Sequence, residues 1–307
     1  MSKIKEILKK NPTIYALNEK YQKIKFNAIS QLSSISPDLV TKIRYKNVFF
    51  KKLDIDNPQN YNEKIIWLKA RKYANDPLVT QCADKYAVRE YVEKCGLGHI
   101  INDLIGVWDR AEDINWDELP NQFAIKCNHG CGYNIVCHDK AVFDIKKATK
   151  QLDKWMHTEY WKEYAEVHYK AMPKKIICEK YLGKGEALPG DYKIYCFNGE
   201  PEYIGNYVER NMAEDTFLRG YFDIDWNPID ILTFEQDTEA FQRPATLETM
   251  LEYARILSKP FPMVRVDFYE VDGKIYLGEL TFTPAGGMAN YYTEEAQKKY
   301  GDMIPME

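Results

Sequence analysis

The most informative segment of the 307-residue chain reads Val264-Arg-Val-Asp-Phe-Tyr-Glu-Val-Asp-Gly-Lys-Ile-Tyr-Leu-Gly-Glu-Leu-Thr281. Polar and apolar residues alternate on both sides of an Asp-Gly pair, which is the pattern of two antiparallel strands joined by a tight turn. We therefore predict a long hairpin with strands over residues 263–270 and 275–282. The alternation places Arg265, Asp267 and Tyr269 on one face of the first strand.

The length of the turn decides whether Asp267 and Glu279 share a face. A two-residue turn at Asp272-Gly273 pairs residue 267 with residue 278 and puts Glu279 on the opposite face. A three-residue loop over 271–273 instead makes the two carboxylates same-face diagonal neighbours, with Cα atoms about 7–8 Å apart. We predict the three-residue loop, because that spacing suits oxygen ligands on Mg²⁺. The alternative is that these are ordinary charges on the solvent face of a hairpin.

A second segment, Phe123-Ala-Ile-Lys-Cys-Asn-His-Gly-Cys-Gly-Tyr-Asn134, predicts a strand, a glycine loop and a returning strand. Lys126 ends the first strand, and Gly130 and Gly132 let backbone N–H groups approach an anion, which is typical of phosphate binding. The Gly-Lys-Ser/Thr ending of a P-loop is absent. A plain glycine hairpin loop is the alternative interpretation.

Cysteine and histidine also gather in this region, at Cys127, His129, Cys131, Cys137 and His138. Their spacing matches no paired Cys-x-x-Cys unit, so the pattern does not favour structural zinc.

Two further segments indicate nucleotide contacts. In Ile176-Ile-Cys-Glu-Lys-Tyr-Leu182 a strand ends in a carboxylate followed by an apolar pair, so an adenine ring could lie there while Glu179 accepts a hydrogen bond from its exocyclic amine. In the strand that begins at residue 190, Asp191 and Lys193 share a face, and Lys193 could reach phosphates. The alternative for the first segment is a strand that ends in a surface charge. The alternative for the second is a solvent-exposed edge strand.

The remaining patterns predict a mixed arrangement of helices and strands. Helices are expected over 2–32 with an interruption at Pro12, and over 60–73, 84–95, 145–154, 161–169 and 247–258. Further strands are expected near 105–108, 175–181, 192–197 and 202–207. Strands and helices do not alternate strictly, so the class is α+β and not a parallel βαβ sheet.

Composition places the chain among ordinary globular proteins, with 45% hydrophobic and 29% charged residues. Disorder, collagen and coiled coil are therefore excluded as starting points. No apolar run approaches the ~18 residues of a membrane span, and the N-terminus lacks the apolar core of a secretory signal. Seven thinly spread cysteines argue against a disulfide scaffold, so we expect a cytoplasmic protein.

Charge is distributed unevenly along the chain. Residues 1–52 contain 12 Lys and Arg against three acidic residues, a net charge of +9, while the whole chain has −4 and the remainder therefore −13. The basic segment is interpreted either as a helix pair packed on the body or as a surface for anionic membrane or a partner complex. The 23 tyrosines are compatible with stacking on sugar faces, although most are expected in the core.

Taken in order, these segments resemble the ATP-grasp superfamily and, more narrowly, its TupA-like branch, named for teichuronopeptide biosynthesis. The resemblance runs from about residue 48 to about residue 300. It is carried by Asn62-Glu-Lys64, Ala83-Asp-Lys-Tyr-Ala-Val-Arg-Glu-Tyr-Val92, Leu119-Pro-Asn-Gln-Phe-Ala-Ile-Lys-Cys-Asn-His-Gly130, Asp191-Tyr-Lys193, Phe222-Asp223 with Trp226, Arg265-Val-Asp-Phe-Tyr269 and Gly278-Glu-Leu-Thr-Phe-Thr-Pro284.

The resemblance implies an ATP-grasp fold, in which two α+β subdomains clasp ATP, here preceded by an N-terminal helical segment. We expect the basic helical segment over residues 1–60. The first subdomain, with the glycine loop, is expected over 61–182, and the second, with the metal-binding hairpin, over 183–307.

The resemblance also implies roles for individual residues. Lys126 resembles the phosphate-binding lysine, and residues 130–134, with Gly130, Gly132 and Asn134, resemble the mobile glycine loop. Glu179, Lys180, Tyr181 and Leu182 look like the adenine hinge. Asp191, Lys193 and Arg265 look like further nucleotide or transition-state contacts. Asp267 and Glu279 look like metal carboxylates, with Thr281 where the superfamily usually has Asn. His129 is a candidate contact for substrate or γ-phosphate.

The implied reaction is amide formation with ATP and Mg²⁺ as cofactors. ATP phosphorylates a carboxylate and an amine displaces the phosphate, while Mg²⁺, Lys126 and Arg265 stabilise the transferring phosphoryl group. The branch suggests a uronic acid as donor, free, nucleotide-linked or polymeric, in capsule or surface polysaccharide biosynthesis. An amino acid or small amine would accept.

Two other readings stay open, a phosphotransferase acting on a sugar or small molecule and a nucleotide-binding module without chemistry. No nucleic-acid partner is expected. Residues 1–52 could dock a cytoplasmic protein on the inner face of the membrane.

Overall fold

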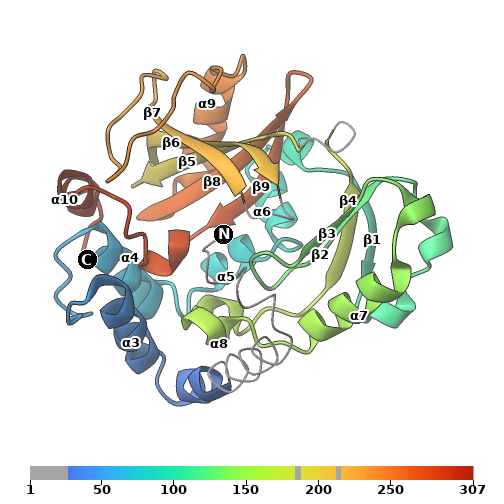
Figure 1. Ribbon diagram of the computed structural model, residues 1–307, viewed down its shortest axis with the longest axis horizontal. Coiled ribbons are helices and arrows are strands. Elements are labelled where there is room, and N and C mark those ends of the chain that lie inside the picture. The colour runs from blue at the N-terminus through green and yellow to red at the C-terminus, as the bar shows by residue number, and fades with distance from the viewer. Residues whose placement is uncertain (1–26, 184–187, 212–215, 307) are drawn as a thin grey trace, which may run out of the picture.

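Two antiparallel sheets form the framework of the computed structural model, which describes residues 27–183, 188–211 and 216–306 (Figure 1). The first sheet has the order β1 (Leu104–Trp108), β4 (Ile176–Lys180), β2 (Phe123–Cys127) and β3 (Asn134–Cys137). The second has the order β7 (Thr216–Asp223), β6 (Glu200–Asn211), β5 (Gly190–Phe197), β8 (Met263–Val271) and β9 (Lys274–Thr281). The predicted α+β class is confirmed.

Helices connect and cover the sheets. They are α3 (Pro37–Phe49), α4 (Tyr61–Trp67), α5 (Pro77–Ala83), α6 (Val88–Lys94), α7 (Ile145–Met156), α8 (Trp161–Tyr164), α9 (Leu247–Ser258) and α10 (Glu294–Asp302). Residues 27–35 are also helical, and the part of the predicted 2–32 helix before residue 27, including the break at Pro12, lies outside the described residues. The helices predicted over 145–154 and 247–258 are confirmed as α7 and α9.

Three helices and one strand were not predicted, namely α3, α5, α10 and β7. Each of these helices starts at a side-chain cap: Ser36 accepts from the backbone of Leu39, Asp76 from that of Leu78, and Thr293 from that of Ala296. The apolar periodicity of such short helices is weak, so the caps are the better signal.

The predicted helix over 84–95 is shorter than expected. It begins at Val88, because the Asp84 carboxylate accepts from the backbone N–H groups of Tyr86 and Ala87 and holds a turn there.

Two large hydrophobic cores and one smaller cluster, made of Tyr45, Leu53, Ile55 and Ile66, form among the described residues. The core of the first sheet contains Phe123, Ile125, Leu152 and Ile176. The core of the second sheet combines its strands with α9 and also with apolar residues of the segment 61–100. That segment therefore packs with the second sheet, which differs from the expected first subdomain over 61–182.

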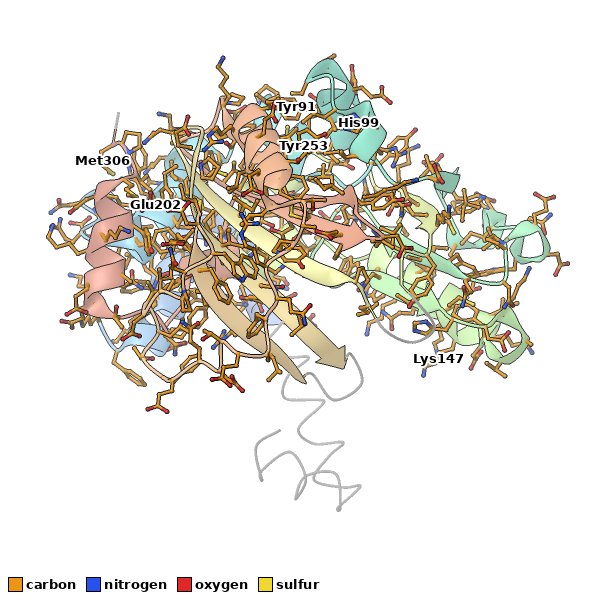
Figure 2. All side chains as sticks on the ribbon, turned by 90° about the horizontal axis from the view of Figure 1, so that it is seen from above. Tyr91, His99, Lys147, Glu202, Tyr253 and Met306 are labelled. Atoms are coloured by element: carbon orange, nitrogen blue, oxygen red, sulfur yellow. The ribbon has the colours of Figure 1, made fainter. Side chains whose placement is uncertain are left out.

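The view from above separates the two ends of the molecule. Lys147 of α7 lies at the end of the first sheet, while Glu202 of β6 and Met306 lie at the opposite end (Figure 2). Between them, the Nε2 atom of His99 lies 2.9 Å from the hydroxyl of Tyr253 on α9. The segment that follows α6 thus ties α9 to the strand β1 of the first sheet.

Much of the tyrosine excess lies in the second core. Tyr195 and Tyr203 stack with ring centroids 4.2 Å apart, and Tyr203 lies 4.3 Å from Tyr300. These rings are buried, so they fill volume in the core rather than serve a binding surface.

The turn of the β8–β9 hairpin is shorter than predicted, and a β-bulge further along the hairpin compensates for the difference. Its turn has two residues, Asp272 and Gly273, both with positive φ, so the predicted three-residue loop is wrong. From the turn up to Phe268, opposite Leu277, the pairing follows this two-residue turn. The register then shifts by one, and Asp267 lies opposite Glu279. Gly278 is the extra residue of a β-bulge, which returns both carboxylates to one face.

A side chain at position 278 has little room in this bulge. A Cβ atom there would lie 3.1 Å from the Asp267 carbonyl oxygen and 3.1 Å from the Tyr269 ring. We expect Gly278→Val to lower the free energy of unfolding by about 1–3 kcal/mol and to reduce activity by displacing Glu279. The measurement is thermal unfolding together with turnover.

Gly273→Asn is the matched control in the same hairpin. The backbone at position 273 has a left-handed conformation, which Asn tolerates, and nothing lies within 4 Å of a Cβ atom placed there. We expect its stability to stay within about 0.5 kcal/mol of the parent. Equal effects of the two substitutions would show that the bulge has no special requirement for glycine.

Candidate active site

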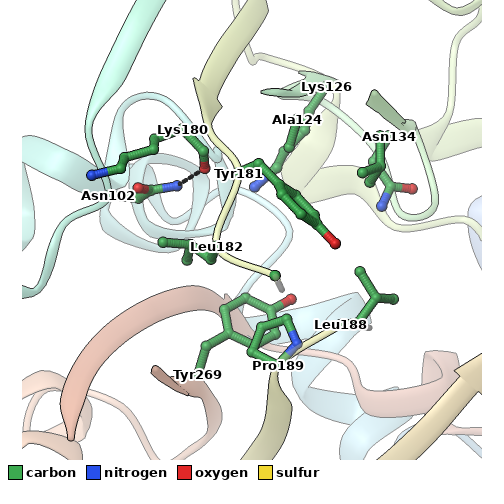
Figure 3. Close-up of a pocket in the computed structure, with 12 residues that line it drawn as sticks. Asn102, Ala124, Lys126, Asn134, Lys180, Tyr181, Leu182, Leu188, Pro189 and Tyr269 are labelled. Atoms are coloured by element: carbon green, nitrogen blue, oxygen red, sulfur yellow. Dashed lines mark hydrogen bonds between the residues drawn. The ribbon is translucent and has the colours of Figure 1, made fainter. Parts of the chain in front are cut away.

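A pocket lies between the two sheets, where the first sheet faces β5 and β8 (Figure 3). It is lined by Asn102, Ala124, Lys126, Asn134, Val136, Lys180, Tyr181, Leu182, Gly183, Leu188, Pro189 and Tyr269. We refer to it as the interlobe pocket. The structure thus brings together five residues predicted to contact nucleotide: Lys126, Asn134, Lys180, Tyr181 and Leu182. Tyr181 and Tyr269 approach it from opposite sheets, and such a largely apolar slot suits a purine ring.

Lys126 and Glu179 form an ion pair beside this pocket. Their strands β2 and β4 are neighbours, and the Lys126 Nζ atom lies 2.6 Å from Glu179 Oε2. Arg89 lies 3.4 Å from the other carboxylate oxygen of Glu179 and donates to the Asn102 carbonyl. Both oxygens of Glu179 thus face cations, and Glu179 does not line the interlobe pocket. Contacts to a base would therefore fall to the segment 180–182 that follows it.

A cluster of paired charges lies on the β8–β9 hairpin and the adjacent strand β5. Arg265 donates to Asp267 through Nε and a terminal nitrogen, each at 2.6 Å. The Lys193 Nζ atom lies 2.8 Å from Asp267 and 2.8 Å from Asp191. All four side chains are largely buried, and Asp267 is directly opposite Lys193 in the strand register. Asp191, Lys193, Arg265 and Asp267 therefore form one connected network of ion pairs.

The two carboxylates of the hairpin differ in their environment. Burial raises the pKa of Asp267, although Arg265 and Lys193 oppose that shift. Burial would also raise the pKa of Glu279, but Lys85, Arg265 and Lys193 outweigh it and hold that pKa well below its usual range. The Glu279 side chain is 30% exposed, against 4% for Asp267. Glu279 is therefore the ionised carboxylate that is open to a ligand.

Lys85 connects the glycine loop with the hairpin. Its Nζ atom donates to the Gly130 carbonyl at 3.0 Å and lies 3.3 Å from Glu279 Oε2. The sequence pattern assigned no role to Lys85, although it lies in the segment 83–92 that carries part of the resemblance. The loop containing Gly130 and Gly132 is thus held next to the carboxylates.

The hairpin offers only oxygen ligands to a metal ion. Thr281 Oγ1 donates to Glu279 at 2.9 Å and accepts from Arg265 at 3.0 Å, so it lies beside both. Within the described ranges, no group of three or more His, Cys, Asp or Glu side chains forms a complete metal cage. Mg²⁺ usually takes one or two carboxylates and completes its shell with phosphates and water. Glu279 and Thr281 therefore fit a Mg²⁺ that arrives with a nucleotide, whereas Asp267 would join them only where Arg265 and Lys193 release its oxygen atoms.

His129 has a different environment from the one expected. Its Nε2 atom lies 3.1 Å from the Trp155 carbonyl on α7, and its ring packs against Tyr133. The side chain is buried, which lowers its pKa and keeps the ring neutral. His129 lines neither the interlobe pocket nor the second pocket, described next.

A second pocket opens on the other side of the hairpin, and we call it the tyrosine pocket. It shares Arg265, Glu279 and Thr281 with the charge cluster. Its other lining residues are Cys131, Tyr133, Tyr160, Glu163, Tyr164, Glu166, Tyr169, Thr283, Ala285 and Gly286. The sequence pattern predicted a helix over 161–169 but assigned no function to these residues, because they approach the hairpin only in the folded chain.

Residues 63–305 match the model of a protein family described as TupA-like ATPgrasp. No curated protein matches the chain in sequence.

Several solved structures are similar at low identity. A D-alanine–D-alanine ligase from Bacillus anthracis is 19% identical over 73% of this chain and 66% of its own, with a TM-score of 0.42. A D-alanine–D-alanine ligase from Helicobacter pylori is 17% identical over 74% and 62%, with a TM-score of 0.43. An L-amino acid ligase from Bacillus licheniformis is 14% identical over 83% and 56%, with a TM-score of 0.46. The chain thus spans less than two thirds of the length of these proteins.

Proposed function

Because this chain belongs to the TupA-like ATP-grasp family, we propose that it is an ADP-forming carboxylate–amine ligase. ATP would bind in the interlobe pocket, with its base between the segment 180–182 and Tyr269. Its phosphates would extend toward Lys126 and the hairpin. The carboxylate and the amine would enter from the tyrosine pocket.

One observation carries this proposal: both pockets end at the same charged hairpin. Tyr269 of β8 lines the interlobe pocket beside Lys126 of β2, and Arg265 and Glu279 of the same hairpin line the tyrosine pocket. A phosphoryl donor on one side and an acceptor on the other would therefore meet where cations and carboxylates are concentrated. Phosphoryl transfer depends on such positioning and charge stabilisation.

The charges of the site are already paired in the protein. Lys126 pairs with Glu179, Lys193 with Asp191 and Asp267, and Lys85 with Glu279. Bound Mg²⁺ would neutralise phosphate charge at Glu279 and Asp267. Lys126, Arg265 and Lys193 would then turn toward the phosphates, so that an acidic body can hold an anionic ligand.

The proposed substrates are a uronic acid as donor and an amino acid or small amine as acceptor, in bacterial surface polysaccharide biosynthesis. The four tyrosine rings of the tyrosine pocket support this choice, because tyrosine presents a flat apolar face with a polar edge to a sugar ring. The donor carboxylate would lie at Arg265, where a fork of N–H groups can hold it.

The test is ADP release with Mg·ATP against a matrix of D-glucuronic and D-galacturonic acid with glycine, L-glutamate, L-lysine and ethanolamine. The ligase proposal expects release that requires both an acid and an amine and yields an amide by mass. A phosphorylated product formed without any amine would identify a phosphotransferase instead. Nucleotide binding without turnover across this panel would indicate a binding module.

The proposal extends to a peripheral membrane contact through the basic N-terminal segment. Apolar side chains of this segment are exposed: Ile35 by 82%, Leu39 by 44%, Ile43 by 42% and Phe50 by 88%. Lys42, Lys46, Lys51 and Lys52 lie next to them in the sequence. Exposed apolar groups among lysines suit an anionic lipid surface. None of the helices formed by the described residues is long and apolar enough to cross a bilayer.

We expect the double variant Ile35→Ser with Phe50→Ser to bind vesicles containing anionic phosphatidylserine at least about 10-fold more weakly than the parent chain. Co-sedimentation at low and high salt measures this. Removing residues 1–52 would be a poor test, because Val40 and Tyr45 of α3 are buried in the core.

Val142→Ser is the control, since Val142 is 83% exposed on another surface. Equal vesicle binding by the parent, the double variant and the control would exclude the membrane contact. A parent chain that self-associates through these side chains and does not bind lipid would exclude it as well.

A further inference from the structure

The tyrosine pocket contains a buried carboxylate to which the proposed function has so far given no role. Glu166 lines this pocket and is only 5% exposed. The Thr283 hydroxyl donates a hydrogen bond to it. Lys69 and Glu163 are the charged groups that face it. A carboxylate so enclosed needs a reason to be retained, because burial disfavours its ionised form.

Glu166 lies on the same wall as the charged hairpin. Thr281 donates to Glu279, and Thr283, two residues further along the chain, donates to Glu166. Both carboxylates line the tyrosine pocket, so the two hydroxyls fix one carboxylate at the proposed phosphoryl site and the other elsewhere on the same pocket wall.

Lys69 donates hydrogen bonds to two segments that line this pocket, one at Tyr164 and one at Gly286. It lies in the π-helical turn η1 (Leu68–Lys72), and its ammonium is 1% exposed. The Nζ atom donates to the carbonyls of Tyr164 at 3.0 Å and Gly286 at 3.4 Å. Burial lowers the pKa of Lys69 to about 8, and Glu166 is the strongest opposing influence on that pKa. Burial raises the pKa of Glu166, and Lys69 is the largest influence in the opposite direction, so Lys69 supplies the positive charge that favours an ionised Glu166.

The chemistry of amide formation requires a proton acceptor at this place. A primary amine is mostly an ammonium ion near neutral pH and cannot attack until it loses a proton. Aromatic rings and carboxylates both attract an ammonium ion. The tyrosine pocket offers four tyrosine rings together with three carboxylates, those of Glu163, Glu166 and Glu279.

We propose that the tyrosine pocket binds the amine substrate as its ammonium ion and that the Glu166 carboxylate accepts the first proton from it. This inference rests on the proposed ligase function. The neutral amine then forms the C–N bond with the acyl carbon, and the C–O bond to the phosphoryl group breaks. The electron pair of that bond leaves with phosphate, which carries away the second proton. Glu166 returns its proton to water.

The test compares two nucleophiles in the variant Glu166→Gln. Hydroxylamine is mainly neutral near pH 7 and needs no base, whereas an alkylamine does. With the acid and amine that give the fastest ADP release, we expect Glu166→Gln to lose about 10²-fold or more of its amide formation. Hydroxamate formation with hydroxylamine should stay within a few-fold of the parent chain.

Glu163→Gln is the matched control. It removes the same charge from the same pocket, but within the described residues Glu163 has no hydrogen bond to Thr283. With both nucleophiles at saturating concentration, we expect this variant to keep the parent's ratio of hydroxamate to amide rates, because Glu163 attracts the ammonium ion but does not accept its proton. If Glu166→Gln folds poorly, Glu166→Asp replaces it, and this variant should lower the amide rate while sparing the hydroxamate rate.

Each outcome distinguishes the inference from the function on which it rests. Equal loss of both rates in Glu166→Gln would assign Glu166 a structural role, and loss of neither would exclude it as the proton acceptor. A parent chain that forms no hydroxamate with any acid would overturn the ligase proposal itself, and the inference with it.

Discussion

Replacing Glu279 with Gln is expected to reduce ATP-dependent ADP release at least about 10³-fold while leaving the fold intact. Glu279 is the hairpin carboxylate that lies open to a ligand, and Lys85, Arg265 and Lys193 hold its pKa well below the usual range. Gln keeps the shape and one acceptor oxygen but loses the charge that Mg²⁺ requires. The fold should survive, because Thr281 can still donate to the amide oxygen.

Glu270→Gln is the control for this loss. Glu270 lies in the same hairpin, loses the same charge, and accepts a hydrogen bond from Thr246 rather than lining either pocket. We expect turnover within a few-fold of the parent. ADP release measured beside thermal unfolding separates the two effects. Normal turnover by the Glu279→Gln variant would contradict the proposal that Glu279 binds the metal ion.

The second large effect is expected for Arg265→Lys. Arg265 contacts Asp267 through two nitrogens at 2.6 Å each and Thr281 at 3.0 Å, which a single ammonium cannot reproduce. The substitution keeps the charge but leaves part of the buried Asp267 carboxylate without a partner. We expect about 1–3 kcal/mol of lost stability. We also expect about a 10²-fold or greater fall in kcat/KM, because the phosphoryl group loses a fixed donor.

Arg255→Lys provides the comparison for this substitution. Arg255 pairs with Glu200 on the surface, with both side chains well exposed, so this change should cost less than about 0.5 kcal/mol and leave kcat/KM unchanged. Urea unfolding and steady-state kinetics of both variants give the two readings. Arg265→Lys with parental kcat/KM would contradict a role for the guanidinium fork.

The hairpin shows where local sequence patterns stop being informative. Alternation predicted β8 and β9, and the Asp272-Gly273 pair marked the turn. The predicted loop length was wrong, because a bulge at Gly278 changes the register in the middle of the strand. Glycine in a strand is a known sign of a bulge, so Gly278 carried that signal. Register is a property of two strands, and one strand's pattern does not reveal where it shifts.

Only some of the residues of the candidate site could be predicted from the sequence. Lys126, Asn134 and the segment 180–182 could be predicted, because each lies at the end of a strand or in a loop with its own sequence signal. Lys85 and Glu166 could not be predicted, because they meet Glu279 and Thr283 across more than 100 residues of chain. Their positions depend on how the segment 61–100 and α8 pack against the second sheet.

The same packing determines where the positive charges of this acidic part of the chain lie. The body after residue 52 has a net charge of −13, yet its cations are concentrated at the site, where Lys85, Lys126, Lys193 and Arg265 each contact a carboxylate. In the proposed reaction, Mg²⁺ at Glu279 and Asp267 would leave the cations paired with these two carboxylates, Lys85, Lys193 and Arg265, available to phosphates.

Transfer of oxygen-18 tests the proposed acyl-phosphate reaction most directly. The carboxylate substrate is labelled in both oxygens, and turnover with Mg·ATP and an amine is followed by mass spectrometry of the released phosphate. Phosphorylation of the carboxylate followed by attack of the amine at the acyl carbon predicts one labelled oxygen in each phosphate formed. Unlabelled phosphate beside a labelled carboxylate, or label retained in a phosphorylated product, would contradict the ligase proposal.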